Sequence, residues 1–288
     1  MKLVIFGCGY TATHLVKAMA PFPPRSVVGT TRSAEKAPML GEIGIEPRVF
    51  PGTDMRNDLA DATHLLISAG PAEGGDPVLA ALRDEIAAIA GRLHWVGYLS
   101  TTGVYGDHDG GWVTEETPLT PSTERGRARV VAEAGWQDLA AETGLPLHIF
   151  RLAGIYGPGR GPFAKVRAGT ARRIIKPGQV FSRIHVDDIA QVLLASMAHP
   201  NPGGIYNLCD DDPAPPQDVI AYAADLLGLP VPPEVAFDQA ELSPMARSFY
   251  AESKRVDNAR IKDELGVKLL YPDYRTGLRQ LLSAETGA

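Results

Sequence analysis

The chain has 288 residues, enough for one large α/β domain or for a domain with an elaborated lobe. Its formal net charge of −6 argues against general nucleic-acid binding, and no apolar run is long enough to span a membrane. Cys8 and Cys209 lie far apart without metal-ligand spacing, so we expect neither a metal site nor a disulfide framework. This cysteine usage, together with an apolar pattern that starts at residue 2 and leaves no room for a signal peptide, predicts a cytoplasmic protein.

The first predicted elements are a strand, a glycine turn and a helix. The apolar run 2–6 is followed by Gly7, Gly9 and Ala12 in the spacing G-x-G-x-x-A, and an apolar-periodic segment begins at Leu15. This spacing in this context indicates dinucleotide binding, with the pyrophosphate at the helix N-terminus. The alternative is a glycine turn in a nucleotide-free α/β fold. The expected cofactor contacts in this turn are Gly7, Gly9, Tyr10, Thr11 and Ala12.

The end of the second strand, 26–31, bears on the choice between NAD and NADP. No acid stands there to bind the adenosine ribose, whereas Arg32 offers a cation suited to a 2′-phosphate. Thr31 and Ser33 add hydroxyl groups, and Lys36 follows closely. We therefore expect NADP, with NAD as the alternative cofactor and a solvated surface arginine as the alternative role of Arg32.

Strands and helices alternate along the rest of the first 209 residues. Further strands are expected at 47–50, 64–68, 95–100, 147–152 and 205–209, and helices at 77–90, at 122–142 with Ser122 as its cap, and from 183 to about 198. The alternation predicts an α/β fold of the Rossmann type, with a doubly wound parallel sheet. Later helices are expected at 216–227 and 259–265.

Ligands of such sheets bind beyond the carboxyl ends of the strands. The expected cofactor contacts at these ends are Asp54, Ser68, Ala69, Gly70, Ala153 and Ile155. We expect the dinucleotide-binding domain to comprise 1–158 and 182–209. A smaller, mixed substrate-binding lobe would comprise 159–181 and 210–288.

A basic segment runs from Arg160 to Arg183. It contains no Asp or Glu, although the protein is acidic overall. One interpretation is a solvated face. The other is a clamp for an anionic substrate, to which Arg183 would contribute.

Four motifs together resemble the extended short-chain dehydrogenase/reductases, which include NAD-dependent epimerases and dehydratases. They are GCGYTA at 7–12, LSTTGVYG at 99–106, RLAGIYGP at 151–158 and IHVDD at 184–188. The resemblance runs from residue 1 to about 209. It implies that the hydroxyl of Thr101 lies beside the reacting carbonyl and the cofactor.

The resemblance also locates two departures from the family pattern. The family's Tyr-x-x-x-Lys pair, which supplies the acid/base, falls on Arg125 and Arg129. Arg129 retains a positive charge for the nicotinamide ribose, whereas Arg125 cannot act as an acid and would contact substrate. Gly154 stands where sugar-nucleotide epimerases usually carry a substrate-binding Asn. The overall pattern is therefore closer to atypical members that lack the Tyr–Lys pair.

Three functions are compatible with this pattern. The first is an NADP(H)-dependent oxidoreductase, epimerase or dehydratase acting on an anionic small molecule, with Thr101, Tyr105 and His185 as catalytic candidates. Tyr105 would otherwise pack beneath its loop, and His185 would cap the next helix. The second is a non-catalytic NADP(H)-binding redox sensor or partner-binding module, and the third is an interaction protein with a vestigial cofactor site. By resemblance, a homodimer would form through the helices 77–90 and 122–142.

Overall fold

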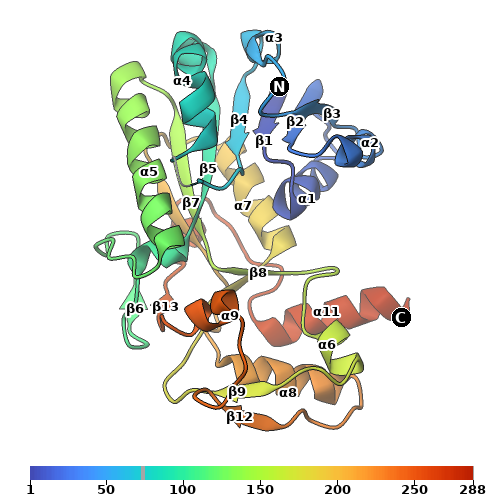
Figure 1. Cartoon of the computed structure of the whole chain (residues 1–288). Helices are drawn as coiled ribbons and strands as arrows, with labels where there is room; N and C mark the ends of the chain where they lie inside the picture. Colours follow the sequence, from blue (N-terminus) through green and yellow to red (C-terminus); the bar gives the residue numbers. More distant parts are fainter. Residues whose placement is uncertain (73–74, 288) are drawn as a thin grey trace.

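The computed structural model describes residues 1–72 and 75–287, and its centre is a seven-stranded parallel sheet. The strand order is β11-β7-β5-β4-β1-β2-β3 (Figure 1). This confirms the predicted doubly wound α/β fold. The strands are β1 (Lys2–Phe6), β2 (Ser26–Thr31), β3 (Glu46–Val49), β4 (His64–Ile67), β5 (Trp95–Thr101), β7 (Leu147–Leu152) and β11 (Ile205–Leu208).

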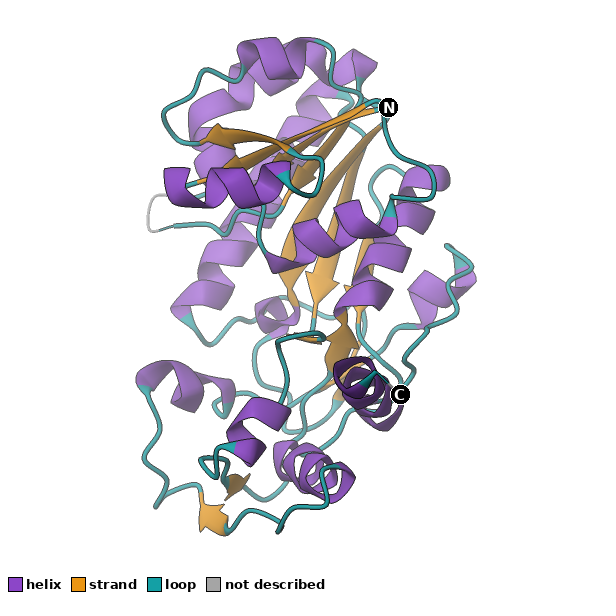
Figure 2. Cartoon of the chain, turned by 90° about the vertical axis from the view of Figure 1, so that its right-hand side faces the viewer, coloured by secondary structure: helices purple, strands orange, loops and turns teal. Residues whose placement is uncertain are grey.

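Helices cover both faces of this sheet, which makes three layers (Figure 2). One face packs against α1 (Tyr10–Ala18), α2 (Ala37–Gly41), α7 (Val186–Ala198) and α10 (Ala259–Asp263). The other face packs against α3 (Arg56–Ala60), α4 (Pro77–Ile89) and α5 (Glu124–Thr143). Among the described helices, none is long and apolar enough to cross a bilayer.

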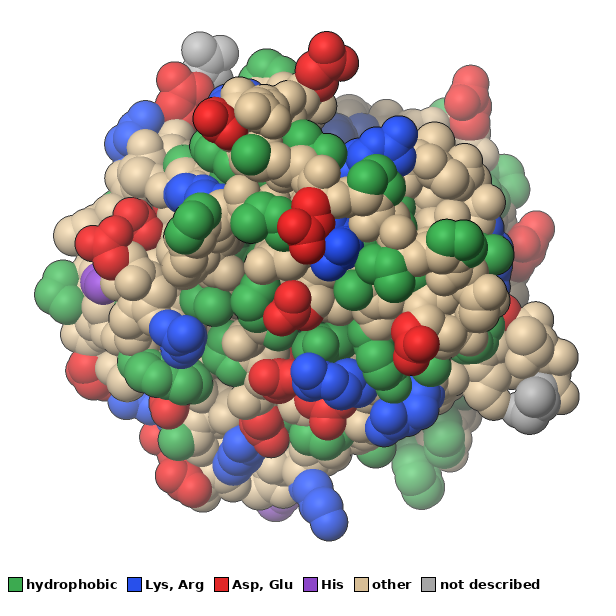
Figure 3. All heavy atoms as spheres, turned by 90° about the horizontal axis from the view of Figure 1, so that it is seen from below, with side chains coloured by type: hydrophobic (Ala, Val, Ile, Leu, Met, Phe, Trp, Pro, Cys, Tyr) green, Lys and Arg blue, Asp and Glu red, His purple; other side chains and the backbone are tan. Residues whose placement is uncertain are grey.

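A smaller lobe lies below the carboxyl ends of the strands in Figure 1. Its elements are α6 (Phe163–Arg167), β9 (Arg173–Ile175), α8 (Pro216–Leu226), β12 (Glu234–Ala236), α9 (Pro244–Phe249) and α11 (Tyr274–Thr286). A separate apolar core that includes Phe163, Ala223 and Leu278 holds it together. Seen from this end, Lys and Arg side chains are interspersed with Asp and Glu (Figure 3).

Short parallel strand pairs join the sheet and the lobe. β8 (Gly154–Tyr156) pairs with β10 (Arg183–His185), and β6 (Trp112–Val113) pairs with β13 (Arg255–Val256). The stretch after β13 differs from the expected division of the chain, because Ile261 and Leu265 are buried in the core of the sheet rather than in the lobe. The expected lobe 210–288 therefore includes a segment that packs with the sheet.

Two predicted helix starts are displaced. Thr123, not Ser122, caps α5, since its hydroxyl accepts the N–H of Gly126 at 3.1 Å. The helix expected from residue 183 begins at Val186, because residues 183–185 form β10 instead.

The sequence did not predict the short strands β6, β8, β9, β12 and β13. Each is too short to show a periodic pattern of apolar residues.

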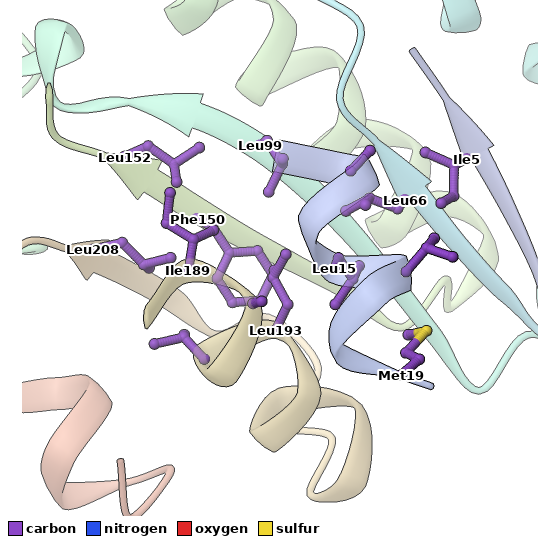
Figure 4. Packing of buried hydrophobic residues seen from close by; sticks show 14 of the residues in the cluster. Ile5, Leu15, Met19, Leu66, Leu99, Phe150, Leu152, Ile189, Leu193 and Leu208 are labelled. Atoms are coloured by element: carbon purple, nitrogen blue, oxygen red, sulfur yellow. The ribbon is translucent and has the colours of Figure 1, made fainter. Parts of the chain in front are cut away.

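The core beneath the glycine turn fixes the first helix against the sheet. Figure 4 shows Leu15 of α1, Leu193 of α7 and Phe150 of β7 gathered in one cluster. Leu15 and Leu193 are fully buried, and α1 packs directly against α7. Close packing of this kind holds the N-terminus of α1 at the carboxyl edge of the sheet.

Candidate functional site

A cleft of about 1270 Å³ lies between the sheet edge and the lobe. From the sheet side it is lined by the ends of β4, β5 and β7 and by the first turns of α5. From the lobe side it is lined by residues of α8, α9 and α11. The site candidates that line it are Gly70, Thr101, Arg125, Arg129, Ala153, Gly154, Ile155 and Arg183.

The glycine turn after β1 is not part of the cleft lining, but it contacts Ala69, the neighbour of the lining residue Gly70. Gly7 has a φ of +90°, and a Cβ there would lie 2.6 Å from the backbone N of Ala69, so only glycine fits. A Cβ on Gly9 would meet no described atom within 4 Å, so the space beside this residue is open. Gly9 is the N-cap of α1 and has no capping side chain, which leaves the first N–H groups of the helix available to an anion.

Ala12, the third residue of the motif, is fully buried between α1 and the sheet. Thr11 is also buried, whereas Tyr10 is half-buried and faces the loop 157–160 through its hydroxyl. The residues present in the turn therefore fit the pyrophosphate of a dinucleotide.

The end of β2 presents one cation to solvent. Arg32 is exposed, and within the described part of the chain it has no hydrogen-bond or ion-pair partner. Thr31 is buried, and its hydroxyl accepts the N–H of Ser33 at 3.2 Å, which closes the turn around Arg32. This arrangement leaves the guanidinium of Arg32 available to a ligand.

The carboxylate of Asp54, which follows β3, accepts hydrogen bonds from the side chain of Arg56. Arg56 Nη2 lies 2.7 Å from Asp54 Oδ2, and Arg56 Nε lies 3.0 Å from Oδ1. The hydrogen bonds from Arg56 lower the pKa of Asp54 to about 2. Asp54 therefore meets any cofactor as a carboxylate already paired with arginine.

The replaced Tyr–Lys positions both line the cleft. Arg129 is half-buried, and its Nη1 donates to the carbonyl of Leu99 at 2.6 Å and to the hydroxyl of Tyr98 at 3.1 Å. Its Nη2 points toward Gly70, where a Cβ would lie 3.3 Å away. Arg125 is exposed one helical turn earlier and has no ion pair among the described residues. α5 thus directs two positive charges toward the cleft.

Thr101 lies at the end of β5 on the cleft wall. Its Oγ1 accepts the N–H of Gly103 at 3.2 Å and caps a short 3₁₀ turn, Thr102–Tyr105. A threonine hydroxyl retains its own hydrogen when its oxygen accepts, so Thr101 can still donate into the cleft.

Tyr105 does not line the cleft, which corrects the expectation that it borders the substrate pocket. It is fully buried, and its hydroxyl donates to Asn207 Oδ1 at 2.7 Å and accepts from Arg151 at 3.0 Å. Arg151 in turn forms a buried ion pair with Glu133 at 2.8 Å. Burial raises the pKa of Tyr105 to about 12. Its contacts are those of a packing residue beneath the loop.

His185 is likewise outside the cleft lining. It is fully buried, and its Nδ1 accepts the N–H of Asp187 at 3.2 Å, which caps α7. The centre of its ring lies 4.0 Å from the centre of the Tyr271 ring and 5.1 Å from the centre of the Tyr156 ring. Burial lowers the pKa of His185 to about 4, so the ring is neutral near pH 7. The placement corresponds to the helix-capping alternative.

The basic residues of the segment 160–183 lie in different places, some at the cleft and others in ion pairs away from it. Arg183 is half-buried on the cleft wall and donates to the carbonyls of Phe181 and Ala214, both at 3.0 Å. Arg167 instead pairs with Glu285 at 2.7 Å and Arg173 pairs with Glu234 at 3.1 Å, both away from the cleft. The segment is thus neither a single clamp nor a uniform solvated face, since among its basic residues, all of which the structure describes, only Arg160 and Arg183 line the cleft.

Several cleft residues come from the C-terminal part of the chain and were not predicted. Lys254 lines the cleft with a nearly buried side chain, and its Nζ donates to the carbonyl of Gly106 and to Glu252, each at 2.6 Å. Ser253 beside it binds both Gly178 and the loop at Asp107. The sequence offered no local signal for these contacts, because Gly178 is 75 positions from Ser253 and Gly106 is 148 positions from Lys254.

Comparison with known proteins agrees with the family resemblance. Residues 72–209 match the model of the NAD dependent epimerase/dehydratase family. Protein YeeZ of Escherichia coli (strain K12) is 30% identical, and the alignment covers 94% of this chain and 97% of that protein.

Solved structures share the fold. A functionally unknown conserved protein from Silicibacter pomeroyi DSS is 60% identical with a TM-score of 0.92, over 100% of this chain and 99% of that one. The UDP-glucuronic acid 4-epimerase from Bacillus cereus, solved in complex with NAD, is 16% identical with a TM-score of 0.78 over 99% of both chains, which is a likeness of fold alone. On the family model and the full-length relative, the chain belongs to the NAD dependent epimerase/dehydratase family.

Proposed function

We propose that the protein binds NADP(H) at the glycine turn and acts as an oxidoreductase or isomerase on an anionic small molecule in the adjoining cleft. The observation that carries this proposal is the open space beside Gly9, at an uncapped helix N-terminus next to the cleft. Family membership and the NAD complex of the Bacillus cereus epimerase support a nicotinamide dinucleotide as the ligand.

Such a dinucleotide, when bound, supplies hydride exchange with the substrate. The hydroxyl of Thr101 would donate a hydrogen bond to the reacting oxygen. Arg129, held in place by the carbonyl of Leu99, would place a fixed positive charge beside the ribose or the developing negative charge. Arg125 and Arg183 would bind the anionic group of the substrate. The proton would come from a group other than Arg125, because a guanidinium keeps its protons.

We assign the NADP preference to Arg32. The test is a fluorescence titration of the purified protein with NADPH and NADH, for the wild type and for Arg32→Glu. A charge reversal at a 2′-phosphate contact should weaken NADPH binding by about 10- to 100-fold and leave NADH binding equal or tighter. Arg92→Glu makes the same charge change at another exposed arginine and should leave both affinities unchanged. If Arg32→Glu behaves like Arg92→Glu, the assignment is rejected, and if the wild type binds neither nucleotide, the function is rejected.

A non-catalytic NADP(H)-binding sensor is the second candidate. The observation that favours it is Arg125, which occupies the position of the family's acid/base. This candidate predicts tight cofactor binding without turnover across a broad panel of carbonyl and carboxylate substrates. Stereospecific hydride transfer to any of them at a useful rate would rule it out.

We also propose a homodimer through α4 and α5. Val131 of α5 is 63% exposed, and Arg83 of α4 pairs with Glu142 of α5 at 2.6 Å, so these two helices form one surface. Light scattering after size-exclusion chromatography measures the mass directly. Val131→Asp should convert a dimer to a monomer, and a monomeric wild type would reject this arrangement.

A further inference from the structure

The turn that leads from the sheet into the lobe is built against the glycine turn. Residues 157–160 close on themselves, since the N–H of Gly157 donates to the carbonyl of Arg160 at 3.0 Å and the N–H of Arg160 donates to the carbonyl of Gly157 at 2.9 Å. Gly157 has a φ of +153°, and a Cβ there would lie 2.6 Å from the hydroxyl oxygen of Tyr10. A side chain at residue 157 would therefore push Tyr10 away.

Tyr10 links this turn to the cofactor site. It is the first residue of α1, directly after Gly9, and its hydroxyl donates to the carbonyl of Pro158 at 3.0 Å. The Cζ atom of Arg160 lies 5.6 Å from the centre of the Tyr10 ring, which is the geometry of a cation–π contact. The main chain of the 157–160 turn and the side chain of Arg160 thus both contact Tyr10, the first residue of α1.

The charge of Arg160 is not neutralised by the protein. The side chain is exposed and lines the cleft, and within residues 1–72 and 75–287 no carboxylate pairs with it. Arg167 and Arg173, in the same basic segment, both have glutamate partners. The first turn of α1 contains no acidic residue either. An unpaired guanidinium therefore stands beside an uncapped helix N-terminus, and the two attract the same anion.

We propose that Arg160 binds the pyrophosphate of the dinucleotide held at the glycine turn, so that the lobe contributes a cofactor ligand. This inference rests on the proposed function. It separates the roles of two arginines, because the pyrophosphate is common to NADPH and NADH whereas the 2′-phosphate assigned to Arg32 is present only in NADPH.

The test is the affinity of Arg160→Met for NADPH and NADH, measured by nicotinamide fluorescence and by calorimetry. Loss of a charge-assisted contact should weaken both nucleotides by the same factor, about 5- to 50-fold, and should reduce the dependence of Kd on salt. Arg160→Lys should recover part of the loss. Lys165→Met removes an exposed charge of the same segment outside the cleft and should bind like the wild type.

Each other result contradicts the assignment in a distinguishable way. Unchanged affinity of Arg160→Met, or an equal loss in Lys165→Met, would show that Arg160 makes no specific contact. A loss confined to NADPH would place Arg160 at the 2′-phosphate instead. A wild type that binds neither nucleotide would reject the proposed function itself, and a loss of affinity fully explained by partial unfolding of ligand-free Arg160→Met at the assay temperature would assign Arg160 to the fold.

Discussion

At the scale of single residues, the local chemistry of the glycine turn was readable from the sequence, whereas the direction of motif side chains was not. Gly7 is required by a close approach to Ala69, and the motif spacing already indicated such a turn. Tyr105 and His185 stand in equally recognisable motifs, yet both are fully buried. Their direction depends on partners such as Asn207 and Tyr271, which lie 102 and 86 positions away along the chain. No local pattern encodes such contacts.

We expect Tyr105→Phe to destabilise the protein without affecting cofactor binding. The change removes a donor to Asn207 and an acceptor for Arg151, both buried, which should cost about 1–3 kcal/mol of unfolding free energy. Urea denaturation measures this loss, and the Kd for NADPH should stay within about twofold, because Tyr105 is outside the cleft lining.

The matched control for this change is Tyr222→Phe. Among the described residues the hydroxyl of Tyr222 accepts only from Arg279, in an exposed contact at 3.0 Å, so its removal should leave stability nearly unchanged. Loss of activity or of NADPH binding in Tyr105→Phe at wild-type stability would show instead that Tyr105 is a catalytic residue, as the sequence predicted.

At the scale of elements, long periodic segments were predicted within a few residues and short ones were missed. α4 was expected at 77–90 and forms at Pro77–Ile89, because its apolar positions recur at helical spacing. By contrast, β13 has only two residues and depends on pairing with β6, about 140 positions earlier. The lobe side of the cleft, including Lys254, is built from such non-local pairs, which explains why the sequence did not reveal it.

The start of α5 provides a test of helix capping. Thr123→Ala removes the hydroxyl that accepts the N–H of Gly126 and should lower the unfolding free energy by about 1 kcal/mol, a decrease in melting temperature of about 2–4 °C. Ser122→Ala removes an exposed hydrogen bond to Glu252 and should have a much smaller effect. Thermal unfolding of the two variants decides between the caps, and a larger loss in Ser122→Ala would reinstate the prediction from the sequence.

At the scale of the whole molecule, the sheet and the lobe meet around the cleft, and we expect the cofactor to stabilise both. A ligand present at 100 times its Kd contributes about 2.7 kcal/mol to the folded state, so NADPH should raise the melting temperature by about 5 °C. NADH at the same concentration should raise it less if Arg32 selects the 2′-phosphate.

Gly9→Asp is the control for this shift. The backbone at Gly9 has φ −101° and ψ −162°, which any residue adopts, and an Asp at an N-cap favours the helix. The ligand-free variant should therefore be at least as stable as the wild type, while its carboxylate fills the phosphate space and repels NADPH. A persisting shift with NADPH would place the nucleotide elsewhere.

The path of the chain through the lobe determines whether the lobe can be separated from the sheet as one fragment. The lobe is assembled from separate stretches that carry α6 with β9, then α8 with β12 and α9, and finally α11, while the intervening segments return to the sheet. No single cut releases the lobe as a continuous fragment. A relative with a different lobe would therefore arise by substitution within these inserted stretches rather than by exchange of one module.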